Sequence, residues 1–404
     1  MRSILLAFLL LSPASAAGTY VLTPTTVDPP GPEAAFTPMR KAVLPSGEIG
    51  EEPWPVVDWC MWHAEADSTL LLGPGSYEPW NAVANKKSPF RVRVIRGMAE
   101  DREQVRLRRN QTGGSSTLGF VHPLYHSHLR LEHLTVEASN NAALLTWENA
   151  HIHLGVDAPF CGIHLIDVLI DGGFDHARGE GFDSKWGCLL NRTSDFVARD
   201  VEVRGIRREH AFYPHQIEGR HEFVRVTVDG VGRTFLQIAN RETENGGARG
   251  FGEVVVRDCY VRNAGLADGG AAITVSGHLG RLVVTDTLVE CSEQGNALVV
   301  WPEYSPPYGK HGTPNGTVVL RGNAFLGGSC VRPLVRLSGA ASLVAEGNTF
   351  ISGLNSIAVD VNPEDGGMAG ALFPLGSIVG RGNEIQGKVL VAGEVLLSSK
   401  PPGK

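Results

Sequence analysis

Segments of alternating apolar and polar residues recur along most of the chain, each with a polar or glycine turn position. The nine segments are EHLTV (132–136), IDVLI (166–170), RDVEV (199–203), VRVTV (224–228), RDCYV (257–261), TDTLV (285–289), RGNAF (321–325), EGNTF (346–350) and RGNEI (381–385). Their central residues are 25 to 36 positions apart. This spacing accommodates two or three strands but no helix, which predicts the coils of a parallel β-helix.

A second family of strands lies between these segments. Its members are AALLTW (142–147), GCLLN (187–191), HAFYPHQ (210–216), FLQIANR (235–241), AAITVSG (271–277), NALVVW (296–301), PLVRLSG (333–339) and SIAVDV (356–361). A β-propeller does not fit, because its blades need about 40–45 residues and four strands. The two families therefore favour a solenoid.

Asparagine occupies the centre of the last three segments of the first family, at Asn323, Asn348 and Asn383. An inward turn position in a solenoid would let their amides stack and hydrogen-bond from coil to coil. The alternative is that Gly-Asn marks hairpin turns in a β-sandwich. Nine copies at the same place in the repeat favour the solenoid.

These patterns resemble the pectate-lyase-like superfamily over roughly residues 65–395. The resemblance implies an all-β fold, a right-handed single-stranded parallel β-helix, which we place at residues 67–395. Residues 17–66 are expected to form an N-terminal arm and cap, with a short helix from Val56 to Ala66 closing the open end of the core. Residues 396–404 are expected to be a tail. A fold of this kind does not by itself name a substrate.

The first 16 residues are typical of a signal peptide. Arg2 precedes the apolar run from Ile4 to Leu11, and small residues follow at positions 14–16. The run is too short to span a bilayer, and no later segment reaches 18 apolar residues. We therefore expect a secreted protein, extracellular or periplasmic, with no membrane span, and we expect a monomer.

The balance of acidic and basic residues in the chain indicates which binding partners to expect. The chain has 36 basic and 43 acidic residues and no basic tail, so nucleic acid is not an expected partner.

The six cysteines of the chain (Cys60, Cys161, Cys188, Cys259, Cys291 and Cys330) contain no C-x-x-C pair. They could form disulfides in an oxidising compartment or serve as small buried apolar residues.

Function in a solenoid must come from outward side chains, and strand alternation predicts which these are. In FLQIANR, Leu236 and Ile238 should point inward, which turns Gln237 and Arg241 outward. In HAFYPHQ, inward Phe212 turns Tyr213 and His215 outward. Aligning the two coils places Tyr213 beside Gln237 and makes Arg241 a diagonal neighbour of His215. His278 continues these columns in the next coil, and Lys185 aligns roughly with Arg208 one coil earlier.

The stretch from residue 204 to residue 241 is rich in cationic and aromatic side chains. It contains Arg207, Arg208, Glu209, His210, Tyr213, His215, Arg220, His221, Arg233 and Arg241. A solvated face is the simple interpretation. The alternative, which we favour, is an anionic polysaccharide lying along the sheet. In that case Arg207, Arg208, His210, Arg220, Gln237 and His278 would bind the substrate.

The chemistry suited to this surface is abstraction of the C5 proton of a uronate sugar. An arginine would neutralise the sugar carboxylate, and a neutral His, or a deprotonated Tyr or Lys, would take the proton. The predicted catalytic residues are His215, Arg241, Tyr213 and Lys185. Departure of O4 would make the enzyme a polysaccharide lyase, whereas return of a proton to the opposite face would make it a C5-epimerase.

A second, local resemblance supports the epimerase alternative. Tyr213-Pro214-His215-Gln216 is similar to the Asp-Pro-His-Asp motif of mannuronan C5-epimerases, and residues 238–241 resemble their downstream strand that ends in Arg. The resemblance implies that His215 is the base and that Arg241 neutralises the carboxylate. Tyr213 and Gln216 stand where that motif has acids.

Three alternatives remain open. The chain could be a non-catalytic glycan-binding or cell-surface protein. It could be a glycoside hydrolase, for which Glu209 and Asp183 form the candidate carboxylate pair. No cofactor or metal site is expected, but calcium is an alternative at four acidic residues of one loop. These residues are Asp171, Asp175, Glu180 and Asp183.

Overall fold

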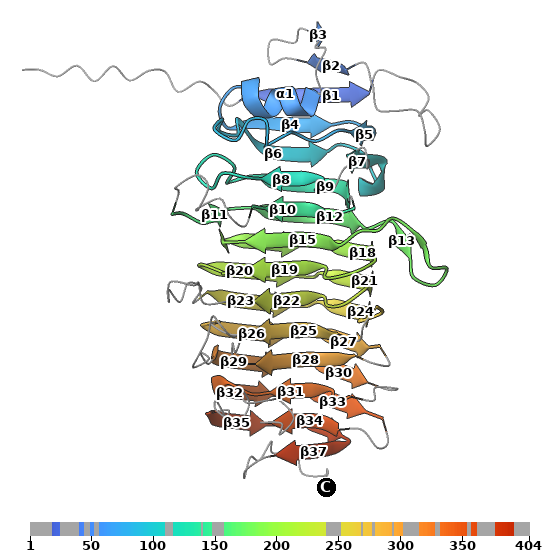
Figure 1. The fold of residues 1–404 in the computed structure, drawn as a ribbon, viewed down its shortest axis with the longest axis vertical. Coiled ribbons are helices and arrows are strands. Elements are labelled where there is room, and N and C mark those ends of the chain that lie inside the picture. Colours follow the sequence, from blue (N-terminus) through green and yellow to red (C-terminus); the bar gives the residue numbers. More distant parts are fainter. Residues whose placement is uncertain are drawn as a thin grey trace, which may run out of the picture.

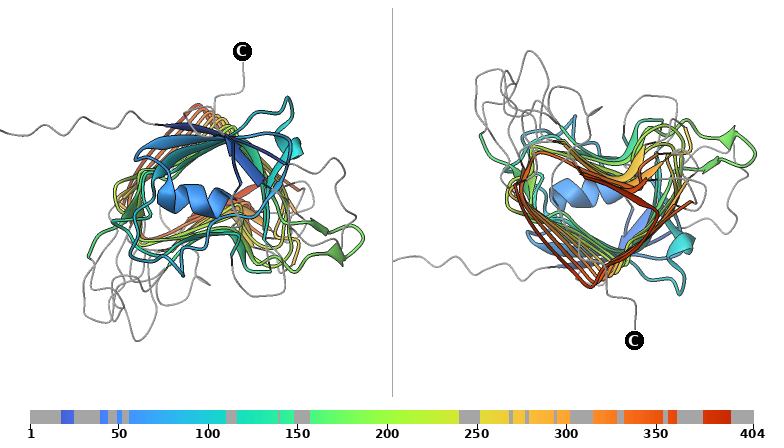
Figure 2. Two further views of the ribbon diagram at one scale, coloured as in Figure 1. Left: turned by 90° about the horizontal axis from the view of Figure 1, so that it is seen from above. Right: turned by 90° about the horizontal axis from the view of Figure 1, so that it is seen from below.

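The computed structural model is described here for residues 18–24, 40–43, 49–51, 56–109, 116–138, 140–147, 157–239, 252–267, 270–276, 279–292, 295–301, 315–327, 332–353, 357–361 and 376–391. The chain is a right-handed parallel β-helix whose coils stack along one long axis (Figure 1). The view along that axis shows successive coils superimposed around a common interior (Figure 2). The predicted fold class is confirmed.

Three walls enclose this interior. Wall 1 is the ten-stranded sheet. It consists of β8 (Leu118–Phe120), β10 (Ala142–Thr146), β15 (Trp186–Asn191), β19 (Phe212–His215), β22 (Leu236–Ala239), β25 (Ala271–Ser276), β28 (Asn296–Trp301), β31 (Val335–Leu337), β34 (Ile357–Val361) and β37 (Lys388–Val391). All eight members of the second strand family lie in this wall.

Walls 2 and 3 belong to the 23-stranded sheet, which bends at a corner. Wall 2 contains β4 (Ser68–Leu72), β6 (Val92–Gly97), β17 (Phe196–Arg199), β20 (Arg220–Val224), β23 (Glu253–Arg257), β26 (Arg281–Thr285), β29 (Asn315–Arg321), β32 (Ala340–Glu346) and β35 (Ser377–Arg381). Wall 3 contains β5 (Gly75–Tyr77), β7 (Val105–Leu107), β18 (Glu202–Ile206), β21 (Thr227–Val231), β24 (Tyr260–Ala264), β27 (Leu288–Cys291), β30 (Ala324–Gly327), β33 (Thr349–Ser352) and β36 (Glu384–Gln386). The long strands β9 (Arg130–Glu137) and β12 (His164–Asp171) run through the corner.

The first family of segments forms this corner between walls 2 and 3. The residue before each segment centre has a positive φ, between 51° and 64°. These residues are His133, Asp167, Asp200, Arg225, Asp258, Asp286, Gly322, Gly347 and Gly382. A single left-handed residue per coil turns the chain, and the next side chain then points into the interior.

The predicted asparagine ladder occupies the interior side of this corner. The Nδ2 of Asn323 donates to the Oδ1 of Asn348 at 2.9 Å, and the Nδ2 of Asn348 donates to the Oδ1 of Asn383 at 2.9 Å. The ladder continues into the preceding coil, where the backbone N–H of Thr287 donates to the Oδ1 of Asn323 at 3.1 Å. The earlier coils carry buried apolar residues at the same position, such as Val201.

The N-terminal end is closed by helix α1 (Val56–His63), which lies over the first coils in both figures. Its buried residues Val57, Cys60 and Met61 join the hydrophobic core. Strand β1 (Thr19–Pro24) pairs in parallel with β4 and antiparallel with β2 (Arg40–Val43), which in turn pairs with β3 (Ile49–Glu51). The region expected to be an arm thus adds a strand to the solenoid.

Cys161, Cys188 and Cys259 are thiols, and the last two are buried in the core. Burial raises the pKa of Cys259 to about 12. Among the residues that the structure describes, no helix is long and apolar enough to cross a membrane. Cys330 and the predicted signal peptide and tail lie outside the described residues.

Candidate functional site

Strand β19 carries the aromatic pair that the sequence predicted to face outward. Phe212 and Pro214 are buried, whereas Tyr213 and His215 are partly exposed. The centroids of the Tyr213 and His215 rings are 4.0 Å apart, and the ring planes meet at 72°. Alternation along one short strand is sufficient to place both rings on the outer face of wall 1.

The strand register places the neighbours of this pair as the alternation predicts. His215 is opposite Asn191 in β15 and opposite Ala239 in β22. The same register sets Tyr213 beside Gln237, whose Nε2 donates to the Oγ of Ser276 in the next coil at 3.3 Å. Polar Gln237 therefore lies beside the Tyr213–His215 pair in the following coil, whereas Asn191 in the preceding coil is buried.

His210, which we predicted to bind substrate, is buried, with only 4% of it exposed. Its Nδ1 is 2.5 Å from the Oγ1 of Thr234, and its ring centroid is 4.6 Å from that of Tyr213. Burial, followed by the charges of Arg233 and His215, lowers the pKa of His210 to about 3. His210 is therefore a neutral ring that packs behind Tyr213.

The cationic residues predicted near the N-terminal ends of β15 and β19 have partners within the protein. Asp183 forms ion pairs with both Arg207 and Arg208. The Nζ of Lys185 lies 4.1 Å from the centroid of the Trp186 ring. Lys185 is one coil before β19, and its carbonyl accepts the backbone N–H of Glu209 at 3.0 Å. Lys185 thus lies at the edge of the wall that carries Tyr213.

Arg220, also predicted to bind substrate, lies on wall 2, whereas Tyr213 lies on wall 1. Arg220 is the first residue of β20 and pairs with Glu222 at 2.6 Å and Glu253 at 2.8 Å. The chain turns between β19 and β20, where Gln216 and Gly219 have positive φ. Two further predicted site residues, Arg241 and His278, lie outside the described residues.

The carboxylate pair suggested for a glycoside hydrolase does not present a free acid. Asp183 is held by Arg207 and Arg208, and Glu209 pairs with the Nη1 of Arg233 at 3.0 Å. Glu209 also lies 3.4 Å from the Nε2 of His210. Both carboxylates of the suggested pair are therefore engaged by arginines of the protein.

The acidic residues suggested for calcium are likewise engaged by protein groups. Asp171 accepts the N–H of Gly173 at 2.9 Å and binds Arg204 at 3.0 Å. Asp175 accepts the backbone N–H of Ala177 at 2.9 Å. In the part of the chain that the structure describes, no three His, Cys, Asp or Glu residues are grouped in a way that could hold a metal ion.

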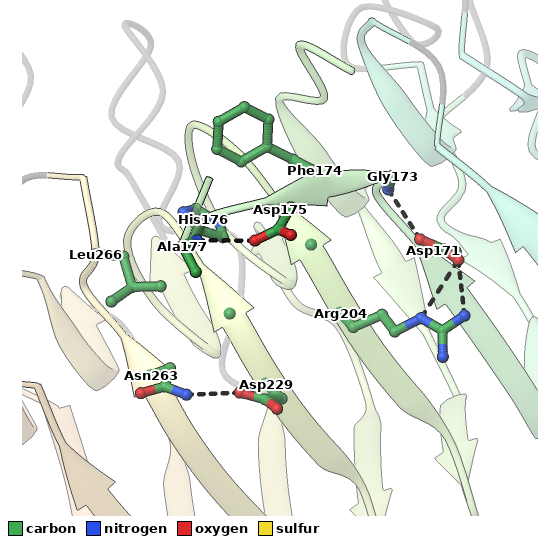
Figure 3. A pocket seen from close by; sticks show the side chains of 12 residues that line it. Asp171, Gly173, Phe174, Asp175, His176, Ala177, Arg204, Asp229, Asn263 and Leu266 are labelled. Atoms are coloured by element: carbon green, nitrogen blue, oxygen red, sulfur yellow. Dashed lines mark hydrogen bonds and ion pairs between the residues drawn. The ribbon is translucent and has the colours of Figure 1, made fainter. Parts of the chain in front are cut away.

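Wall 3 carries a groove that the sequence analysis did not predict. Its volume is about 530 Å³, and it lies between the hairpin of β13 (Phe174–Asp175) and β14 (Glu180–Gly181) and the strands β18, β21 and β24 (Figure 3). The lining residues are Asp171, Gly173, Phe174, Asp175, His176, Ala177, Arg204, Gly205, Asp229, Gly230, Asn263 and Leu266. The run DGGFD, which we considered only for calcium, was the available sequence signal.

Comparisons with known proteins were made for the whole chain. No protein-family model and no curated protein matches it. Among solved structures, the A-modules of the mannuronan C-5 epimerases AlgE4 and AlgE6 of Azotobacter vinelandii are similar, with TM-scores of 0.41 and 0.35 and identities of 10% and 13%. Each comparison covers 86% of this chain and 94% of the module.

A lacto-N-biosidase from Eubacterium ramulus is also similar, with a TM-score of 0.33 and 12% identity. That comparison covers 81% of this chain and 63% of the biosidase. Similarity at this level says nothing about the activity of this chain.

Proposed function

We propose that this chain is an exported carbohydrate-active enzyme that abstracts the C5 proton of a uronate sugar in an anionic polysaccharide. The observation that carries the proposal is the contact between Tyr213 and His215 on the outer face of wall 1, with ring centroids 4.0 Å apart. A tyrosine and a histidine this close can supply both the base and the acid of a proton-transfer reaction. Neutral His210 fixes the ring of Tyr213 from behind.

The proposed reaction begins with transfer of the C5 proton to the imidazole of His215. The electron pair of the C5–H bond moves towards the sugar carboxylate, which a cation must neutralise. Lys185 at the edge of wall 1 and Arg241 are the proposed cations. In a lyase, the C4–O4 bond then breaks, a C4–C5 double bond forms and Tyr213 gives its proton to O4. In an epimerase, a proton donor on the other side of the sugar ring returns a proton to C5 from the opposite face.

The state of the nearby carboxylates favours this chemistry over glycoside hydrolysis. Hydrolysis needs a protonated carboxyl group and a second carboxylate on opposite sides of the bond. Asp183 and Glu209 are both held by arginines. Tyr213 and His215 lie on the outer side of β19 and are partly exposed.

The test measures two products on pectate, alginate and glycosaminoglycan substrates. Ultraviolet absorbance detects the unsaturated product of a lyase, and incorporation of solvent deuterium at C5 without cleavage detects an epimerase. We expect His215→Asn and Tyr213→Phe each to lower kcat by at least about 100-fold. His63→Asn on the exposed side of α1 is the matched control and should retain full activity.

Full activity in both wall 1 variants would refute the assignment of the site. Absence of both products, with polysaccharide binding that the His215→Asn substitution weakens, would replace the enzyme by a glycan-binding protein. Purification of the unprocessed chain from the cytoplasm of its source cell would contradict export.

A further inference from the structure

The groove on wall 3 is separate from the Tyr213–His215 pair, because it opens on a different wall of the solenoid. Its floor consists of the ends of β18 and β21, where Gly205 and Gly230 take φ values of 63° and 76°. Neither glycine carries a side chain that would fill the space. The next coil has Asn263 at the same position, with a φ of 53°. The hairpin β13–β14 forms one side of the groove (Figure 3).

The polar groups of the groove are held in place by the protein. The Asp229 carboxylate accepts from the Nη2 of Arg262 at 2.6 Å and from the Nδ2 of Asn263 at 2.7 Å. Arg204 binds Asp171 and Glu103, and hydrogen bonds with Glu103 and then Asp171 raise its pKa. Pre-positioned groups of this kind do not need to be ordered when a ligand arrives.

The groups that remain available in the groove are mainly acceptors. Each oxygen of a carboxylate has more than one acceptor site, so Asp175 and Asp229 can take further hydrogen bonds. The Nε2 of His176 lies 2.9 Å from the carbonyl oxygen of Ile206, which can only accept. The proton of the neutral ring is therefore on Nε2, and Nδ1 is left as an acceptor. Most donors of Arg204, and one of the two Nδ2 hydrogens of Asn263, already bond to acceptors within the protein.

Apolar surface lies beside these acceptors. Leu266 is 41% exposed, and Phe174 lies across the groove on the hairpin (Figure 3). A volume of about 530 Å³ falls within the range of small-molecule sites, which is roughly 300–1,000 Å³. The ligand should therefore combine several hydroxyl donors with an apolar C–H face.

The charges of the groove favour a neutral ligand over an anionic one. Each carboxylate that lines the groove is paired with an arginine: Asp171 with Arg204, Asp175 with Arg178 and Asp229 with Arg262. A uronate would have to compete with these carboxylates for the arginines, whereas a neutral sugar would not. Metal ions are also unsuited, because the described carboxylates do not converge on a common point.

We propose that the groove on wall 3 binds a neutral sugar unit of an oligosaccharide. The sugar hydroxyls donate to Asp175, Asp229 and the Nδ1 of His176, and one C–H face of the ring packs against Leu266. The site is independent of the chemistry on wall 1. It would allow the protein to hold a glycan that contains neutral units while wall 1 acts on uronate units.

Saturation-transfer NMR and calorimetric titration with four neutral tetrasaccharides test the proposal. The probes are cellotetraose, mannotetraose, xylotetraose and galactotetraose, with tetragalacturonate as the anionic comparison. We expect saturable binding of at least one neutral probe. Binding of that probe should be unchanged in His215→Asn, which separates this site from wall 1.

Gly230→Asn fills the groove without disturbing the backbone. Asparagine already occupies this position in the next coil, and a Cβ at Gly230 would meet only the Cδ2 of His176 at 3.4 Å and the N of Gly205 at 3.8 Å. We expect at least about a tenfold loss of affinity for the neutral probe. The matched control is Gly347→Asn, at a left-handed position (φ 62°) with no atom within 4 Å of the added Cβ.

A second pair of variants tests the apolar contact. Leu266→Ser should weaken binding, whereas Leu124→Ser, at a leucine that is 64% exposed on the loop between β8 and β9, should not. Equal affinity in wild type and Gly230→Asn would overturn the proposal, as would equal losses in Gly230→Asn and Gly347→Asn. Failure of all four neutral probes to bind at millimolar concentration would also overturn it. Tetragalacturonate binding that Gly230→Asn abolishes would refute the neutral ligand class.

Discussion

Truncation of the central ladder residue, Asn348→Ala, gives the most direct measure of what the interior polar column contributes. The side chain of Asn348 makes four hydrogen bonds. Its Oδ1 accepts the backbone N–H of Asn323 at 3.1 Å and the Nδ2 of Asn323 at 2.9 Å. Its Nδ2 donates to the Oδ1 of Asn383 and to the carbonyl oxygen of Leu320, both at 2.9 Å. Asn348 is 1% exposed, so water cannot replace these partners.

The magnitude follows from the groups that alanine leaves without a partner. A buried donor or acceptor that loses its partner costs about 1–3 kcal/mol. Taking the N–H of Asn323 and the carbonyl of Leu320 as the two most affected groups, Asn348→Ala should lower the free energy of unfolding by about 2–6 kcal/mol. The control Asn85→Ala removes one 3.5 Å hydrogen bond at the surface and should cost less than about 0.5 kcal/mol.

The assay combines guanidinium denaturation, followed by circular dichroism, with hydrogen exchange at the amide of Asn323. Exchange is the sharper measurement, because a solenoid can open locally at one end. A third variant, Asn348→Val, restores most of the volume but not the hydrogen bonds, so it should be as unstable as Asn348→Ala. If Asn348→Val is as stable as wild type, or Asn348→Ala matches Asn85→Ala, hydrogen bonding in the ladder is not what stabilises these coils.

Two further predictions concern pH. The free energy of unfolding should fall as the pH decreases from 6.5 towards 3, because burial lowers the pKa of His221 to about 3 and the unfolded chain takes up its proton first. His221→Phe should flatten this decrease by up to about 1.4 kcal/mol per pH unit in a denaturation series, and an unchanged slope would contradict the assignment. The second prediction concerns His133, whose Nδ1 is 2.5 Å from Asp167. The hydrogen bond with Asp167 raises the pKa of His133, so the ion pair stabilises the fold at low pH and is lost as the pH rises through that raised value. Asp167→Asn should remove this decrease at pH values above the ordinary histidine pKa of 6.5, and its persistence would refute the interpretation.

The solenoid could be predicted from the sequence because each coil repeats the same inward positions. The ladder is the clearest case, since an asparagine at one turn position is stable in the interior only if another stacks on it. The same pattern did not show that the first-family segments are corners rather than single strands. That distinction depends on one left-handed residue per coil, and Asp200 or Arg225 in that position does not signal it as glycine does.

The candidate site was harder to predict, because the polar stretch from residue 204 to residue 241 crosses all three walls. Arg204 lies on wall 3, Tyr213 on wall 1 and Arg220 on wall 2. Alternation within a strand correctly predicts that the side chain of Tyr213 points outward. It does not predict the orientation of side chains beyond a turn. His210 precedes β19 at such a turn, where packing against Tyr213 and the contact with Thr234 bury it. Neighbours in the sequence are therefore separated in space by the turns.

The charges on walls 2 and 3 are arranged differently from the polar groups around β19. On wall 3, the column Asp171, Arg204, Asp229, Arg262 and Glu290 pairs in register from coil to coil. The sign of the charge alternates at every step of this column, so neighbouring coils attract each other. On wall 2, Glu253 likewise lies between Arg220 and Arg281 and forms ion pairs with both. The charges within such a column neutralise one another, and their pairing favours the correct stacking of coils.

The corresponding column on wall 1 differs from these columns in its lack of charged residues. Leu189, Tyr213, Gln237 and Thr274 lie next to one another in register, and none of them is charged. The proton-transfer chemistry that we propose lies on this wall, at Tyr213 and His215. Exchanging charges within the columns of walls 2 and 3 should therefore change stability rather than turnover.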